Sequence, residues 1–273
     1  MPYIQGADKT EIYVKDWGEG RPVILIHGWP LNADSWEYQA VKLAEAGYRV
    51  ISYDLRGFGR SEQPWSGYDY DTMSDDLAAI IKELGLKDAT LAGFSMAGGE
   101  VCRYMSRHDG KGIKQAALIS SIAPFMLQTD DNPDGAPADV FEGIKSELRK
   151  DRQQFLAGFF KDFYGNGTEA GGVSDEVLHW SWQMAMLASP KATLDCVDAF
   201  GKTDLRPDFD AMDVPLLVVH GTGDQTVPID ATGRQAAKLA KNAELKEYEG
   251  APHGLTATHA DQLTGDLLAF LKG

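Results

Sequence analysis

The chain has 273 residues, of which 43% are hydrophobic and 25% charged, as in ordinary folded domains, so a disordered or fibrous protein is excluded. Acidic residues outnumber basic ones by 41 to 26, and the formal charge of −15 would repel a phosphate backbone, which excludes nucleic acid as a partner. Two cysteines, Cys102 and Cys196, are too few for a disulfide framework, so we expect free thiols in a reducing cytoplasm.

Targeting and membrane segments are not expected. The N-terminus lacks the basic start and the apolar run of a secretory signal. The longest aliphatic runs, at residues 23–26 and 216–219, have four residues each, whereas crossing a bilayer takes about 20. We therefore predict a cytoplasmic protein without a membrane anchor.

In chain order, the first predicted element is a half-exposed antiparallel strand at residues 11–15, where polar and apolar residues alternate. Continuous apolar runs then predict strands buried on both faces, as in a parallel sheet: residues 23–26, 50–53, 89–92, 116–119 and 216–219. Amphipathic patterns between the strands predict helices at residues 36–46, 70–84, 96–107, 229–240 and 263–271. This alternation indicates an open α/β sheet flanked by helices.

The alternation stops between Pro124 and Pro207. An Asp-rich loop at residues 130–135 is followed by helical patterns at 140–160 and 176–188, without a strand-like run. These patterns are rich in aromatic residues and methionine, some of which are expected to line a pocket. We therefore predict a single domain over residues 1–273, with a helical cap inserted at about residues 125–206.

A serine follows one of the predicted buried strands. Ligands of open α/β sheets bind beyond the carboxyl ends of the strands, so polar residues at these points are candidates for chemistry. Ser95 lies between the strand at 89–92 and the helix at 96–107, which is the setting of a nucleophile elbow. Such a turn is tight and needs small flanking residues, here Gly93 and Ala97, where the usual pattern has a second glycine. The alternative role is a helix N-cap.

Two further loops supply partners for this serine. Asp224 lies in a glycine-rich turn after the strand at 216–219, and His253 lies in a short loop after a strand-like stretch at 245–248. A serine hydroxyl is a weak nucleophile, so an imidazole must take its proton and a carboxylate must orient that imidazole. Because Ser95, Asp224 and His253 follow the chain order of α/β-hydrolase triads, we predict that they form one. A turn former and an ordinary loop histidine are the alternatives.

Several sequence blocks are more specific than the triad itself. They are His27-Gly28-Trp29-Pro30-Leu31 with Ser35-Trp36, residues 54–61, Gly93-Phe94-Ser95-Met96, residues 159–164 and Ala251-Pro252-His253-Gly254. With these blocks the chain resembles, over nearly its whole length, the bacterial cofactor-free haloperoxidases and arylesterases of the α/β-hydrolase fold. These are serine hydrolases that also have perhydrolase activity. The Trp-Pro pair and the Gly-Phe-Ser-Met elbow point to this group most narrowly.

The resemblance implies further site residues. It places the oxyanion hole at the backbone N–H groups of Trp29 and Met96, and it implies that a carbonyl beside Pro30 accepts a hydrogen bond from attacking hydrogen peroxide. Independently, Met96 begins a helix, where an unpaired N–H and the helix dipole favour an anion, and Trp29 follows the first central strand. The resemblance also implies that phenylalanines surround the acyl site: Phe94, Phe125, Phe159, Phe163 and Phe200.

Metal and nucleotide cofactors are not predicted. His27 and His220 end strands and are expected to be buried hydrogen-bonding residues, and His108, His179 and His259 have no acidic or cysteine partners at metal-ligand spacing. The short glycine motif at residues 57–59 lacks the third glycine of a dinucleotide fingerprint. We expect no cofactor.

Asp54 also follows a predicted strand and therefore competes for the role of triad acid. Arg56 and Arg60 lie close to it in the sequence and favour a structural ion pair. We therefore assign the triad acid to Asp224.

The expected activity is the hydrolysis of small carboxylic esters, with short acyl chains and aryl or alkyl leaving groups, through an acyl-serine intermediate. Peracid formation is expected as a side activity. Haloperoxidase or perhydrolase activity, or lactam hydrolysis, is the alternative main activity, whereas dehalogenases and epoxide hydrolases carry Asp where this chain has Ser95. A ligand sensor that does not turn over is the alternative from another class. The expected partner is a small-molecule ester, and a homo-oligomer is left open.

Overall fold

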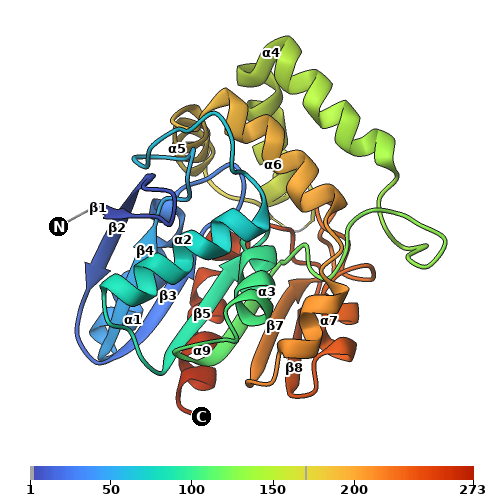
Figure 1. Cartoon of the computed structure of the whole chain (residues 1–273). Helices are drawn as coiled ribbons and strands as arrows, with labels where there is room; N and C mark the ends of the chain where they lie inside the picture. The colour runs from blue at the N-terminus through green and yellow to red at the C-terminus, as the bar shows by residue number, and fades with distance from the viewer. Residues whose placement is uncertain (1–2, 170) are drawn as a thin grey trace.

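The computed structural model describes residues 3–169 and 171–273. A sheet with the strand order β1-β2-β4-β3-β5-β6-β7-β8 runs through the molecule, and helices cover both of its faces (Figure 1). The pairs β1–β2 and β2–β4 are antiparallel, and the other pairs are parallel, which confirms the predicted mostly parallel α/β sheet. The strands are β1 (Tyr3–Gln5), β2 (Glu11–Trp17), β3 (Arg21–Ile26), β4 (Tyr48–Tyr53), β5 (Ala89–Phe94), β6 (Ile113–Ile119), β7 (Leu216–Gly221) and β8 (Ala243–Tyr248).

Burial explains the two sequence patterns of the strands. Every residue of β5 and β7 is buried, because helices cover both faces of the central strands, and these strands are continuously apolar. In β2, which lies near the edge of the sheet, buried and more exposed residues alternate over its first half. The short β1 was not predicted, since three residues carry too little periodicity.

Most helices of the body agree with the predicted helices. α9 begins at Ala260, three residues before the predicted start, and the four-residue α8 was not predicted. The largest difference lies near the loop at residues 222–232 that carries Asp224, called the acid loop here. α7 begins at Gly233, four residues after the predicted start, because residues 225–232 form turns around Asp224 instead of helix. Among the helices formed by the described part of the chain, none has the length and hydropathy needed to cross a membrane. The body helices are α1 (Glu37–Glu45), α2 (Tyr70–Glu83), α3 (Ala97–Arg107), α7 (Gly233–Leu239), α8 (Leu255–Thr258) and α9 (Ala260–Leu271).

Between β6 and β7, the described residues form the short 3₁₀-helix Arg206–Ala211 and three α-helices that together are called the cap here: α4 (Ala138–Tyr164), α5 (Asp175–Met186) and α6 (Pro190–Lys202). The cap helices gather at the top of the view in Figure 1. α4 has a kink at Asp151, whose carboxylate accepts a hydrogen bond from the Gln154 backbone N–H at 2.9 Å and so caps the second half of the helix. α6 was missed, although Ser189 caps its N-terminus and Pro190 opens it.

Candidate active site

Ser95 lies in a strained turn between β5 and α3. Its φ is +55°, in the left-handed region that residues other than glycine rarely adopt. Neighbouring backbone leaves no room for larger residues: a Cβ at Gly93 would lie 2.7 Å from the Ala97 carbonyl oxygen, and one at Gly28 would lie 3.0 Å from the Phe94 carbonyl oxygen. Close backbone approach is therefore the reason for small residues around this serine.

The structure brings together the three predicted triad residues. The Ser95 Oγ lies 2.9 Å from the His253 Nε2, and the His253 Nδ1 lies 2.6 Å from the Asp224 Oδ2. All three residues are buried, with exposed residue fractions of 6% for Ser95, 1% for His253 and 4% for Asp224. Because an ionised carboxylate only accepts hydrogen bonds, the His253 proton lies on Nδ1, and Nε2 is free to accept the serine proton.

The Asp224 carboxylate is held from two sides. Its Oδ1 accepts hydrogen bonds from the backbone N–H groups of Thr226 at 2.9 Å and Val227 at 2.8 Å. Its Oδ2 faces His253 and also the His220 Nε2, at 3.3 Å. Burial by itself would raise the pKa of Asp224, but the two imidazoles outweigh it and hold the pKa well below its usual range. Asp224 is therefore ionised at neutral pH.

His220 is fully buried behind this carboxylate. Its Nε2 donates to the Val227 carbonyl at 2.9 Å, and its Nδ1 has no hydrogen-bond partner among the residues described. The expected buried hydrogen-bonding role is confirmed, but the contact with Asp224 was missed. The signal available in the sequence was the spacing of four residues between a strand end and the acid.

The second strand-end histidine, His27, is structural. Its Nε2 accepts a hydrogen bond from the Leu55 N–H at 2.9 Å, and its Nδ1 lies 3.0 Å from the Gly28 carbonyl oxygen. Burial lowers its pKa, so the ring is neutral. The expectation of a buried hydrogen-bonding histidine is confirmed here too.

The ion pair predicted for Asp54 is half right. Arg60 donates to Asp54 through Nε at 2.7 Å, as expected. Arg56 does not contact Asp54, and this part of the prediction is wrong. Its buried guanidinium lies 2.6 Å from Asp76 on α2 and 2.9 Å from Asp8, because the side chain points toward α2 and the N-terminal hairpin.

Two buried backbone donors lie beside the serine. Trp29 and Met96 are 4% and 1% exposed, and both line the cavity over Ser95. Within residues 3–169 and 171–273, neither backbone N–H donates a hydrogen bond. Met96 is the N-cap residue of α3, so its N–H belongs to the unpaired donors of the helix start. The Trp29 indole donates to the Thr193 carbonyl at 3.1 Å, which ties this residue to the cap.

A cavity of about 360 Å³ lies over Ser95 and His253. Its inner wall is buried and apolar, with Ile122 and Phe141 beside Trp29 and Met96. Exposed residues form its mouth, from the segment before and at the start of α4 on one side and from the acid loop on the other: Asp134, Pro137, Val140, Gln225 and Pro228. Such a shape suits a small apolar ligand with one reactive polar group.

The five predicted pocket phenylalanines have different positions. Phe159 and Phe200 line the cavity, and their rings lie 5.3 and 5.7 Å from the Trp29 ring. Phe94 and Phe163 are absent from the wall of this cavity. They pack against the His253 ring, with centroid distances of 5.3 and 4.8 Å.

The fifth, Phe125, lies beneath the Arg206 guanidinium at 5.0 Å and also does not line the cavity. Phe141 lines it instead and was missed. The two residues have the same side chain and lie on either side of the same loop. Only the path of that loop decides which of them faces the serine.

Comparisons with known proteins agree with this geometry. The profile of the alpha/beta hydrolase fold matches residues 21–260, and the chain belongs to this family. It is 45% identical to a non-heme chloroperoxidase of Kitasatospora aureofaciens and 40% identical to a bifunctional esterase/perhydrolase of Acinetobacter calcoaceticus, each over the whole of both chains. The crystal structure of a bromoperoxidase from Bacillus anthracis superposes with a TM-score of 0.95, at 44% identity and 99% coverage of both chains. The resemblance to the haloperoxidase and arylesterase group is confirmed.

Proposed function

We propose that this protein is a serine hydrolase that cleaves small carboxylic esters through an acyl-enzyme on Ser95. The observation that supports this best is the hydrogen-bonded chain from Ser95 through His253 to a buried, ionised Asp224, at the inner end of an apolar cavity. A helix N-cap does not explain this chain, because a serine cap needs no histidine and no buried carboxylate.

In the proposed reaction, the Ser95 Oγ attacks the ester carbonyl carbon while the His253 Nε2 takes its proton. Asp224 stabilises the imidazolium, and the unpaired N–H groups of Trp29 and Met96 bind the oxyanion. The imidazolium then protonates the departing alcohol. Water, deprotonated by His253, attacks the acyl group and releases the acid, which restores the free serine.

The apolar wall sets the expected acyl group. Phe159, Phe200 and Trp29 pack edge to face on one side of the cavity and limit its depth near the serine. A cavity of about 360 Å³ has room for a short acyl chain and a small leaving group. We therefore propose acetate to butyrate esters as substrates.

Peracid formation is the proposed side activity. Hydrogen peroxide would replace water in the second step, so that the acyl group leaves as a peracid and a proton passes to His253. The relatives support this: one is named a bifunctional esterase/perhydrolase and another a non-heme chloroperoxidase. A peracid oxidises halide in solution, so the two names describe compatible chemistry.

The test measures steady-state turnover of p-nitrophenyl acetate and labelling by a serine-reactive organophosphonate followed by peptide mass spectrometry. We expect many turnovers, an adduct on Ser95, and loss of both in Ser95→Ala. Added hydrogen peroxide should divert part of the acetyl groups to peracetate. An adduct elsewhere on an active enzyme would disprove the proposal, and a single turnover would identify the ligand sensor instead.

The proposal also includes three predictions made from the sequence about domain organisation, partner and cellular location. They are the single domain with a cap at about residues 125–206, a small-molecule ester as partner and a cytoplasmic location.

A further inference from the structure

The mouth of the active-site cavity carries a single charged residue. Of its exposed lining residues, Asp134 is acidic and the others are proline, valine or glutamine. Among the other residues that line the cavity, His253 has the only ionisable side chain apart from the nucleophilic Ser95. The Asp134 carboxylate makes no hydrogen bond or ion pair within the described chain, so its charge is not neutralised by a neighbouring side chain.

The loop that carries Asp134 has a fixed path. It extends from the body of the molecule between β6 and α4 (Figure 1). The buried Asn132 side chain donates to the Phe125 and Leu127 carbonyls at 3.2 and 2.8 Å, and the Ala136 N–H donates to the Met126 carbonyl at 2.7 Å. These bonds tie both ends of the loop together and hold Asp134 at the cavity.

Arg206, whose guanidinium lies against this loop, is already paired with carboxylates other than Asp134. Arg206 pairs with Asp131 at 3.0 Å and with Asp204 at 2.7 Å, and its guanidinium covers the Phe125 ring. It therefore has two carboxylates of its own and does not offset Asp134. An approaching substrate meets a negative charge beside an otherwise uncharged opening.

We propose that Asp134 makes the enzyme prefer esters that carry a positive charge, such as a quaternary ammonium group on the alcohol, over neutral and anionic esters of the same shape. This inference rests on the proposed ester hydrolysis. Opposite charges a few ångströms apart in a partly solvated mouth attract enough to change relative rates by about 3- to 10-fold. The preference should weaken with salt, because the carboxylate is exposed.

The experiment compares three butyrate esters at low ionic strength: butyrylcholine, its neutral isostere 3,3-dimethylbutyl butyrate, and 3-sulfopropyl butyrate, whose negative charge also lies on the alcohol. In Asp134→Asn we expect the ratio of kcat/KM for the cationic ester to that for the neutral ester to fall about fivefold. The anionic ester should improve, and the neutral ester should stay within about twofold, since no packing is removed.

Asp130→Asn is the matched control, because Asp130 lies in the same loop and carries the same charge but does not line the cavity. It should leave the ratio unchanged. An equal fall in Asp130→Asn would assign the effect to the net charge of the molecule and overturn the proposal, as would an unchanged ratio in Asp134→Asn. If wild-type protein does not hydrolyse the neutral ester, ester hydrolysis itself has failed, which is a separate result.

Discussion

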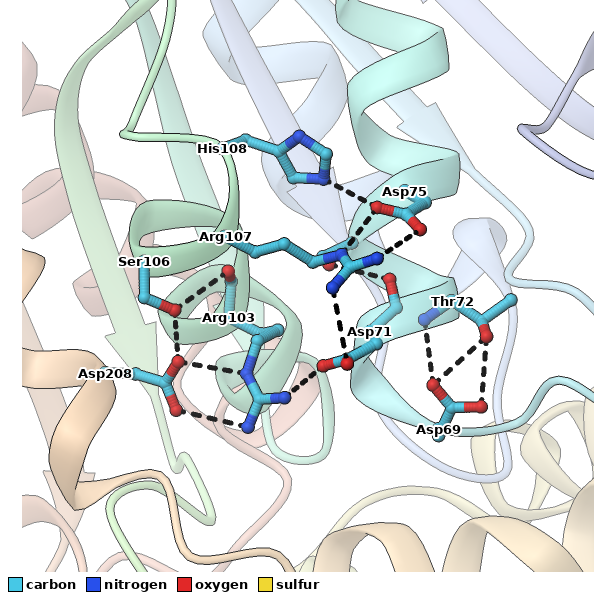
Figure 2. Close-up of polar contacts among 10 residues, drawn as sticks. Asp69, Asp71, Thr72, Asp75, Arg103, Ser106, Arg107, His108 and Asp208 are labelled. Carbon is cyan, nitrogen blue, oxygen red and sulfur yellow. Dashed lines mark hydrogen bonds and ion pairs between the residues drawn. The ribbon is translucent and has the colours of Figure 1, made fainter.

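Within the described residues, two places bring serine, histidine and aspartate side chains close together. One is the chain of Ser95, His253 and Asp224 beneath the cap. The other, in Figure 2, joins α2, α3 and the short helix at Arg206–Ala211, where His108 bonds to Asp75 at 2.8 Å and Ser106 bonds to Asp208. The residue types are the same, so the difference between the two places lies in geometry and burial.

In the α2–α3 network, the carboxylates of Asp75 and Asp208 are each paired with a guanidinium. Arg107 donates to Asp75 at 2.8 Å, and Arg103 donates to Asp208 at 2.9 Å. The Asp75 and His108 side chains are 27% and 26% exposed, whereas that of Asp224 is fully buried. Solvent therefore screens the charge of Asp75 and an arginine neutralises it, whereas Asp224 has imidazoles and backbone N–H groups as its partners.

The order of the groups also differs. Ser106 donates to a carboxylate directly, and no imidazole lies between them to take the serine proton. The pocket beside His108 is not lined by Ser106, so this serine faces no substrate cavity there. At the active site the imidazole lies between the serine and the acid, beside two free backbone donors. A nucleophilic serine depends on this order and on exclusion of water, which residue type alone does not supply.

The largest expected effect separates the two histidines. His253→Ala should lower kcat/KM for p-nitrophenyl acetate by about 10⁴-fold or more, as should Ser95→Ala, because triad members act as a unit. His108→Ala should leave kcat/KM within about twofold of the wild-type value, since the partner of His108 is Asp75, a partly exposed carboxylate. Steady-state kinetics of the three variants, with circular dichroism to verify folding, measures this. Comparable losses in both histidine variants would contradict the assignment.

The next effect concerns the aromatic rings around each histidine. His108 stacks on one ring, that of Tyr104 at 5.2 Å, whereas His253 lies between Phe94 and Phe163. Phe163→Ala should lower the free energy of unfolding by about 3–5 kcal/mol and reduce kcat, because a fully buried ring behind the imidazole is lost. Thermal denaturation and kinetics measure both.

Phe159→Ala is the matched variant, on the same helix and at the cavity wall. It should shift kcat/KM toward hexanoate and octanoate esters, because the acyl site becomes deeper. Phe163→Ala should leave the chain-length profile unchanged. A shift of that profile in Phe163→Ala alone would show that the two rings have been assigned the wrong way round.

A smaller effect tests the support of the triad acid. His220→Leu removes the buried imidazole whose Nε2 lies 3.3 Å from the Asp224 carboxylate, and we expect kcat to fall about tenfold, because the carboxylate loses one of the two imidazoles that hold its pKa low. His220→Gln, whose amide N–H reaches a similar position, should recover most of that loss. KM should change little in either variant, because His220 does not line the cavity. Equal losses of kcat in both variants would show that His220 contributes by packing and not through its contact with Asp224.

The smallest effect is expected in the α2–α3 network. The hydrogen bond from Arg107 lowers the pKa of Asp75, so this group stabilises the fold at neutral pH, and the contribution is lost as pH falls through its lowered pKa. Asp75→Asn should therefore cost about 0.5 kcal/mol at pH 7, less in high salt, and nothing in strong acid. Urea denaturation at each pH measures this. A salt-independent cost above about 2 kcal/mol would mean that the network behaves as a buried one.

The sequence determined what depends on short segments. Continuous apolar runs predicted the central strands, and the strand, tight turn and helix around Ser95 predicted the elbow, since these patterns reflect local periodicity and backbone sterics. The order of Ser95, Asp224 and His253 predicted which residues would meet, because parallel strands end at one edge of the sheet.

Only the tertiary structure decided which equivalent side chains face the cavity. Phe141 lines it and Phe125 does not, Arg56 binds Asp76 instead of Asp54, and the charge of Asp134 lies at the mouth. In each case the residue type is the same for either outcome. For Phe141 and Asp134 the choice is made where the loop after β6, the kinked α4 and the acid loop meet, and for Arg56 it is made beside α2 and the N-terminal hairpin. Contacts between segments so far apart in the chain leave no periodic signal in the sequence.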